Sequence, residues 1–142
     1  NEREKLIYLA GLFDGEGCVS AASSTGCLRV DFGMCHGPAV TLFAETFGAW
    51  QGQQVMKSGR IIYQSTLHRQ KAADALEKLL PWLQAKETAA QLGLALHKEY
   101  LRTYRSHKRS ETDQLRRLLY VKRLSDHNHG RQTGWEDALH RP

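Results

Sequence analysis

Two carboxylates lie two residues apart in the short segment Asp14-Gly-Glu-Gly17. Carboxylate oxygens are ligands that Mg²⁺ prefers, and one or two of them together with substrate phosphates can hold the ion. A bound divalent cation can activate water and stabilise a leaving oxygen, as hydrolysis of a phosphodiester requires. The segment is therefore a candidate metal site. Taken alone, it could equally be the glycine-capped end of a buried helix, with its acids in solvent.

The acids follow a segment with helical spacing. Its apolar residues are Leu6, Leu9, Ala10 and Phe13. This spacing predicts a helix over residues 3–13 that ends in the acidic turn. A glycine inside a helix costs about 1 kcal/mol relative to alanine. The small pair Ala10 and Gly11 therefore indicates that another backbone comes very close to this helix.

The nine residues Leu9-Ala-Gly-Leu-Phe-Asp-Gly-Glu-Gly17 resemble the motif that names the LAGLIDADG homing endonucleases. Six of the nine letters are identical, and the other three, Phe13, Gly15 and Glu16, are conservative replacements. The resemblance implies that motif helices of two domains pack together through their small residues. It also implies that the acid in the eighth position, Glu16, binds the catalytic metal, with the carbonyl of Gly15 as a further ligand.

The composition is that of one globular domain. The chain has 142 residues, 41% of them hydrophobic and 25% charged, which is enough to bury a core. No apolar run approaches the roughly 18 residues of a membrane span, and the polar start is unlike a signal peptide. We therefore expect an intracellular protein in a reducing compartment, with three free cysteines and no membrane partner.

Basic residues are concentrated late in the chain. Residues 98–131 hold ten of the 20 Lys and Arg residues against four acids, within a net charge of +5. A polyanion, and nucleic acid first, is the expected partner, although solvated helix faces would show the same pattern. We expect four of these residues to grip phosphates: Arg102, Arg105, Lys108 and Arg109.

The order of elements predicts an α+β fold. Strand patterns cover residues 17–24, 27–34, 53–57 and 60–68, in two hairpins, and helical patterns cover 37–48, 71–83, 86–104 and 112–124. The order resembles the αββαββα core of the LAGLIDADG endonucleases, which implies an antiparallel sheet forming a DNA-binding saddle, here with added C-terminal helices. We predict one domain over 1–125 and an irregular tail over 126–142.

One face of this sheet is expected to read DNA, because a β ribbon can enter the major groove. By alternation, its polar residues are Ser20, Ser24, Arg29, Asp31, Lys57, Arg60, Gln64, Thr66 and His68. The resemblance places Lys86, after a Pro-containing segment, and more loosely His36 close to the acid. Both are predicted as catalytic residues beside Glu16.

The motif occurs once; Leu92-Gly-Leu-Ala-Leu is the nearest fragment, and no acidic turn follows it. The resemblance is therefore to the single-motif, homodimeric type, in which a twofold axis supplies the second acid. The expected interface consists of Tyr8, Ala10, Gly11 and Asp14, with Asp14 capping the partner helix or the turn.

These features predict an intron-encoded, site-specific endonuclease that cuts double-stranded DNA at a long pseudo-palindromic site. The cofactor would be Mg²⁺ or Mn²⁺, with Ca²⁺ as a non-catalytic substitute. The alternative is a non-cleaving DNA-binding regulator or an RNA-splicing maturase that binds intron RNA on the same fold. Those proteins need no acid, so Glu16 favours a nuclease. His127-Asn128-His129 spells the letters of HNH nucleases, but those residues would be dispersed rather than consecutive.

Overall fold

The computed structural model describes residues 1–22, 25–104 and 110–130. The elements in chain order are α1 (Glu2–Glu16), β1 (Gly17–Ala21), β2 (Leu28–Met34), α2 (Gly37–Phe47), β3 (Trp50–Val55), β4 (Ile61–His68), α3 (Arg69–Leu79), a 3₁₀ turn (Leu80–Trp82), α4 (Glu87–Tyr104) and α5 (Glu111–Asn128). The predicted α+β class and the αββαββα order are confirmed.

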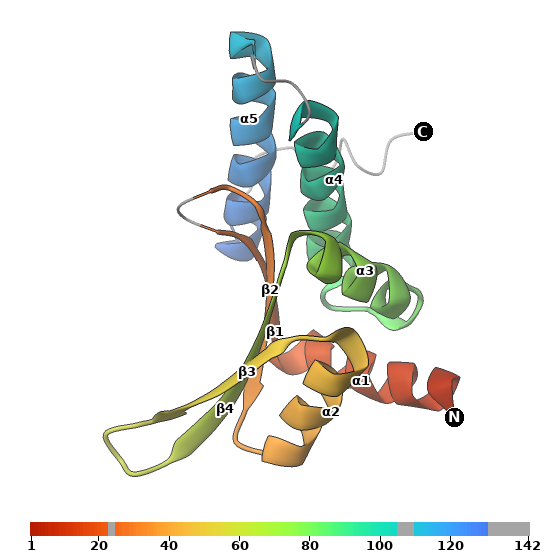
Figure 1. Ribbon diagram of the computed structural model, residues 1–142, viewed down its shortest axis with the longest axis vertical. Helices are drawn as coiled ribbons and strands as arrows, with labels where there is room; N and C mark the ends of the chain where they lie inside the picture. The colour runs from red at the N-terminus through yellow and green to blue at the C-terminus, as the bar shows by residue number, and fades with distance from the viewer. Residues whose placement is uncertain (23–24, 105–109, 131–142) are drawn as a thin grey trace.

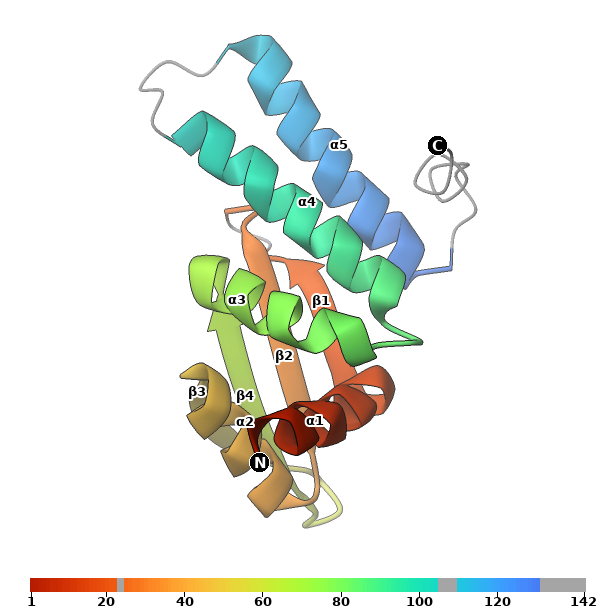
Figure 2. The same cartoon turned by 90° about the vertical axis from the view of Figure 1, so that its right-hand side faces the viewer.

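The four strands form one antiparallel sheet in the order β1-β2-β4-β3. Helices α1, α2 and α3 lie over the same face of the sheet, and α4 continues this layer towards β1 and β2 (Figures 1 and 2). The opposite face of the strands is left open by these helices (Figure 1). Helix α5 packs beside α4 and against β1.

Alternation along the strands separates a buried face from a polar one. In β2, Leu28, Val30 and Phe32 are buried. The ring of Phe32 packs on Phe43 of α2, with centroids 4.8 Å apart. The side chains between the apolar positions therefore point to the open face, as the sequence predicts.

Two elements extend beyond their predicted ends. Helix α1 continues through the acidic segment to Glu16 and passes directly into β1, so no separate turn exists there. Helix α5 reaches Asn128, and the predicted boundary at residue 125 falls inside it. Its last turn packs against β1: Asp126 is buried, and Asn128 donates a hydrogen bond to the Val19 carbonyl at 2.7 Å. Among the described helices, none is long and apolar enough to cross a membrane.

Candidate metal centre and nucleic-acid interface

The position of Glu16 is fixed by packing directly beneath it. Gly17 follows it and begins β1, and a Cβ atom on Gly17 would lie 2.2 Å from the ring of Phe13. That ring is fully buried and stacks parallel to Phe43 at 6.1 Å. Only glycine fits at this junction, so the end of α1 is anchored in the core while the Glu16 side chain is exposed.

The electrostatics of this helix end favour a cation. A helix C-terminus carries partial negative charge, and acids there are disfavoured by about 0.3–1 kcal/mol each. The last turn of α1 contains Asp14 and Glu16 and no basic residue. Within the described chain, Glu16 makes no hydrogen bond or ion pair. Its carboxylate is therefore available to a positively charged ligand.

Asp14, by contrast, is used within its own chain. Its carboxylate accepts hydrogen bonds from the backbone N–H groups of Gln84 and Lys86, each at 3.0 Å. These bonds tie the end of α1 to the segment that leads into α4. Asp14 was expected to cap the partner helix or the turn; in this chain it caps the segment of Gln84 and Lys86, because the 3₁₀ turn brings those N–H groups to it.

Lys86 lies at the end of α1, as predicted. Its half-buried side chain places Nζ 3.3 Å from the Asp14 carbonyl, to which it donates. The ammonium group thus offsets part of the negative charge of the last helical turn. It reaches this end on the side of Asp14.

A surface hollow of about 420 Å³ brings together residues that are distant in the sequence. It is lined by Glu16, Gly33, Met34, Cys35, His36, Arg60 and Ile62. Glu16 and His36, both predicted as catalytic, share it with Arg60, which was predicted as a DNA contact. An acid, an imidazole and a guanidinium therefore face one space, while Lys86 lies outside it.

The outer face of α1 is apolar, and two of its positions are glycines without side chains. Ile7 and Tyr8 are 42% and 49% exposed, and Cβ atoms added to Gly11 or Gly15 would meet nothing within 4 Å. Small residues four apart on a helix let a second backbone approach closely. The prediction of Ala10 at this interface is wrong, because Ala10 is fully buried in the core of its own chain. Gly15, by contrast, is exposed.

The open face of the sheet is polar and its side chains form rows across the strands. Strand pairing sets Ser20, Arg29 and His68 in one row, then Cys18, Asp31, Thr66 and Trp50, then Gly33, Gln64 and Gly52. The predicted residues of β1, β2 and β4 thus lie together on this face. Lys57 lies in the exposed β3–β4 turn, and Ser24 lies outside the described residues.

Trp50 belongs to this face and was missed. It is 63% exposed, and its ring lies over Gly52, where a Cβ atom would come within 2.3 Å. Gln54, two residues after Gly52, lies on the same face, and its side-chain oxygen accepts a hydrogen bond from the Gln64 amide at 3.4 Å. The alternation Trp50, Gly52, Gln54 could have revealed them, but the strand was expected to start only at residue 53.

Several basic residues of α4 and α5 are neutralised where these helices meet. Arg102 bonds to Glu99 and reaches Asp113 at 2.7 Å, and Arg116 lies 3.3 Å from Glu99. The hydrogen bond from Arg102 lowers the pKa of Glu99 below its ordinary value of 4.5. Arg102, predicted to grip phosphate, is thus held by acids of its own chain, and its phosphate contact stays a prediction. Arg105, Lys108 and Arg109 lie outside the described residues.

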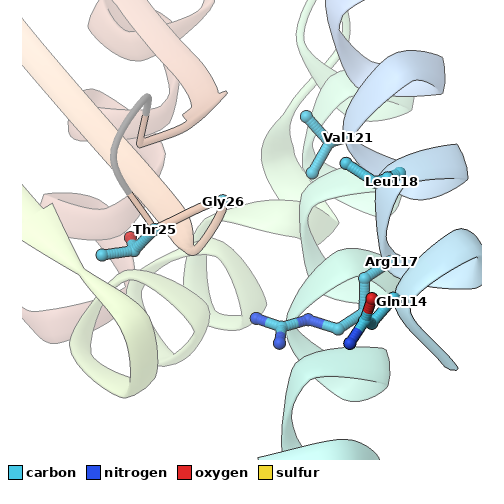
Figure 3. Close-up of a pocket in the computed structure, with 6 residues that line it drawn as sticks. All are labelled: Thr25, Gly26, Gln114, Arg117, Leu118 and Val121. Carbon is cyan, nitrogen blue, oxygen red and sulfur yellow. The ribbon is translucent and has the colours of Figure 1, made fainter. Parts of the chain in front are cut away.

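A second hollow, of about 270 Å³, lies between the β1–β2 hairpin and α5 (Figure 3). Its labelled residues are Thr25, Gly26, Gln114, Arg117, Leu118 and Val121 (Figure 3). It contains no acid, and the Arg117 guanidinium lies 5.0 Å from the ring centre of Tyr100. This hollow is a packing seam between hairpin and helix and offers no chemistry.

No group of three or more His, Cys, Asp or Glu residues that could hold a metal occurs within the described ranges. The His127-Asn128-His129 triplet is the end of α5: Asn128 binds the β1 backbone, and the His129 ring bonds to the Ser125 carbonyl at 2.7 Å. A metal at Glu16 would therefore draw ligands from DNA or from a second chain.

No protein-family model matches the chain, and no curated protein matches it in sequence. Solved structures do match it in fold. The homing endonuclease I-CvuI, in complex with its target, has a TM-score of 0.69 at 17% identity, covering 87% of this chain and 82% of that one. The chain thus has the fold of the LAGLIDADG homing endonucleases, and the resemblance indicated by its nine-residue motif is confirmed in the fold.

Two further solved structures differ in the share of their length that this chain covers. The archaeal intron-encoded homing endonuclease I-Vdi141I, complexed with DNA, has a TM-score of 0.71 at 13% identity over 89% of this chain and 85% of that one. The LAGLIDADG meganuclease I-AabMI, bound to uncleaved DNA, has a TM-score of 0.54 at 17% identity over 82% of this chain but only 43% of that one. The chain therefore corresponds to nearly all of the first protein and to less than half of the second.

Proposed function

We propose that this protein is a metal-dependent endonuclease that cuts double-stranded DNA at a long pseudo-palindromic site as a homodimer. The observation that carries the proposal is the placement of Glu16. A carboxylate that is exposed and has no partner among the described residues ends a helix whose outer face is open to a second backbone. The acid also borders the polar sheet face.

A twofold axis along the outer face of α1 would complete the site. It would set Gly11 and Gly15 of two chains against each other and bring two Glu16 side chains together. The 142 residues match 82% of I-CvuI and 43% of I-AabMI, and they contain the motif once.

Glu16 and the Gly15 carbonyl would hold Mg²⁺ or Mn²⁺, with Ca²⁺ binding as a non-catalytic substitute. When bound, the ion supplies an activated water and stabilises the leaving oxygen. His36 lines the same hollow and is placed to hold or pass a proton. Arg60 and Lys86 provide positive charge for the phosphate on either side of the acid.

The polar sheet face would supply the DNA contacts. Each two-stranded hairpin of this sheet, β1–β2 or β3–β4, suits the major groove, and the rows of the face offer hydroxyl, amide, guanidinium and imidazole groups to base edges. Two such faces related by a twofold axis would read two half-sites in inverted order. This symmetry is the reason to expect a pseudo-palindromic target.

The test is cleavage of a pooled library of pseudo-palindromic duplexes in Mg²⁺. We expect the native chain to cleave one subset and Glu16→Gln to lower that rate by roughly a thousandfold or more, while binding in Ca²⁺ and the dimer persist. The matched control is Glu45→Gln, which removes another exposed acid, on α2. It should cleave like the native chain.

Each other outcome has its own meaning. Tight, salt-sensitive binding without cleavage by the native chain would contradict the nuclease and favour a DNA-binding regulator or an RNA-splicing maturase with intron RNA as partner. Equal cleavage by the native chain and Glu16→Gln would remove the acid from the mechanism. A monomer that cleaves would contradict the shared site.

A further inference from the structure

Arg29 on the open face is held in one orientation by a carboxylate beside it. Its Nε donates to Oδ2 of Asp31 at 2.9 Å and its Nη2 donates to Oδ1 at 3.1 Å. Asp31 is held in turn, because the Thr66 hydroxyl donates to the same Oδ1 at 2.8 Å from the neighbouring strand β4. The result is a guanidinium fixed by two parallel hydrogen bonds whose acceptor is itself fixed.

Fold stability gives little reason for this arrangement. The side chains of Arg29 and Asp31 are 44% and 33% exposed, and exposed ion pairs contribute little. A phosphate contact gives no reason either. A carboxylate next to a phosphate-binding arginine cancels the charge that attracts the polyanion. The Arg29–Asp31 pair carries almost no net charge, so the effect of the carboxylate is to fix the orientation of the guanidinium.

The donors that remain free point to a ligand. A guanidinium has five N–H groups. Asp31 takes the Nε hydrogen and one Nη2 hydrogen, which leaves an edge formed by Nη1 and Nη2. Two parallel donors at this spacing match O6 and N7 of guanine in the major groove, the commonest specific contact of arginine with DNA.

We propose that Arg29 is a specificity-determining residue that reads one guanine in each half-site, and that Asp31, locked by Thr66, is its positioning residue. The inference rests on the proposed DNA binding. It adds which base Arg29 contacts and which residue orients Arg29. Asp31 does not itself contact a base here, because its two oxygens already accept three hydrogen bonds.

The experiment selects bound duplexes from a library with randomised half-sites, using the full chain in Ca²⁺ so that binding is read without cleavage. We expect the native protein to select guanine at one symmetric position, with roughly tenfold or greater discrimination. Arg29→Lys keeps the charge and should lose that preference. Asp31→Asn keeps Arg29 but should reduce the preference several-fold. Gln91→Ala, at an exposed position of α4 away from this face, should leave it intact.

A base analogue separates base reading from a phosphate contact. Replacing the selected guanine with 7-deazaguanine removes the N7 acceptor, so it should weaken the native protein several-fold and leave Arg29→Lys unaffected. Uniform weakening of all sequences by Arg29→Ala, with a salt slope smaller by about one, would make Arg29 a phosphate contact and overturn the proposal.

The guanine contact of Arg29 and the proposed function can be disproved separately. If Asp31→Asn retains the full guanine preference, the positioning role is wrong. If the native protein selects a sequence that Arg29→Lys reads identically, the inference fails and the proposed function stands. If the native protein binds no DNA, both fail.

Discussion

Two glutamates show how differently this chain treats the same carboxylate. Glu99 on α4 is only 5% exposed, and the guanidinium groups of Arg102 and Arg116 surround it. Glu16 at the end of α1 is exposed and, among the described residues, has no partner. The first acid is neutralised by the fold, whereas the second lies at the negative end of a helix and forms no ion pair among the described residues.

The difference separates charge that is paired within the fold from charge that the described fold leaves unpaired. Basic residues are concentrated late in the sequence, yet Arg102, Arg116 and Lys122 of α4 and α5 all reach acids of their own chain. The charge on these three side chains is therefore compensated within the pair α4–α5. Glu16 lies elsewhere, at the end of α1, in the hollow with His36 and Arg60.

The largest effect should come from blocking the face that brings a second Glu16. Gly11→Leu adds a side chain where a Cβ meets nothing in the same chain, so the fold should tolerate it. We expect the dimer dissociation constant, from sedimentation equilibrium, to rise at least about a hundredfold, since the backbones can no longer approach. DNA cleavage should be lost with the dimer.

The control for that change is Gln91→Leu, which adds the same side chain at an exposed position of α4. It should leave the dimer and cleavage unchanged. A dimer of undiminished strength in Gly11→Leu would show that α1 is not the interface, and the contrast between the two glutamates would then need another source of counter-charge.

The two acids should also differ in what they contribute to folding. Glu99→Gln should lower the free energy of unfolding by roughly 2 kcal/mol, because the buried carboxylate of Glu99 loses its charged hydrogen bonds to arginine. Glu16→Gln should leave it unchanged or raise it by about 0.3–1 kcal/mol, since an acid at a helix C-terminus is unfavourable. Urea denaturation of both variants measures the contrast, and equal losses would contradict it.

The pH dependence of stability follows from the same contacts. The pKa of Glu99 is lowered, first by the hydrogen bond from Arg102. Its contribution is therefore complete above the ordinary pKa of 4.5 and is lost as the pH falls through the lowered folded value. The native chain should lose stability over this acid range more steeply than Glu99→Gln. Parallel curves would remove Glu99 from the acid transition.

The sequence predicts the framework because periodicity is local. Alternation in residues 28–34 and helical spacing after residue 37 fix which faces are buried, and the pairing within each hairpin follows from its turn. The central β2–β4 pairing joins the two hairpins and is long-range. The motif places Glu16 by a resemblance that the fold supports. Element ends are less predictable, since α1 continues to Glu16 only because Phe13 packs under Gly17.

What the sequence does not reveal is which groups are already occupied. Asp14 and Arg102 look available in the sequence, but a 3₁₀ turn and a neighbouring helix supply their partners. Ala10 and Gly11 are adjacent small residues, yet one faces the core and the other solvent. Trp50 was missed because a strand start depends on a partner 16 residues later, Thr66. The partners Gln84 of Asp14 and Asp113 of Arg102 are distant in the sequence, so no local pattern encodes those contacts.

The smallest expected effect asks directly whether Glu16 is kept for a cation. A ligand that binds only the folded state stabilises it by about 1.4 kcal/mol at ten times its dissociation constant. Adding Ca²⁺ or Mg²⁺ should therefore raise the melting temperature of the native chain and of Glu99→Gln by the same few degrees. Glu16→Gln should show no rise, with Na⁺ at matched ionic strength as the control. A rise that persists in Glu16→Gln would place the cation elsewhere, and the free carboxylate at the end of α1 would lose its explanation.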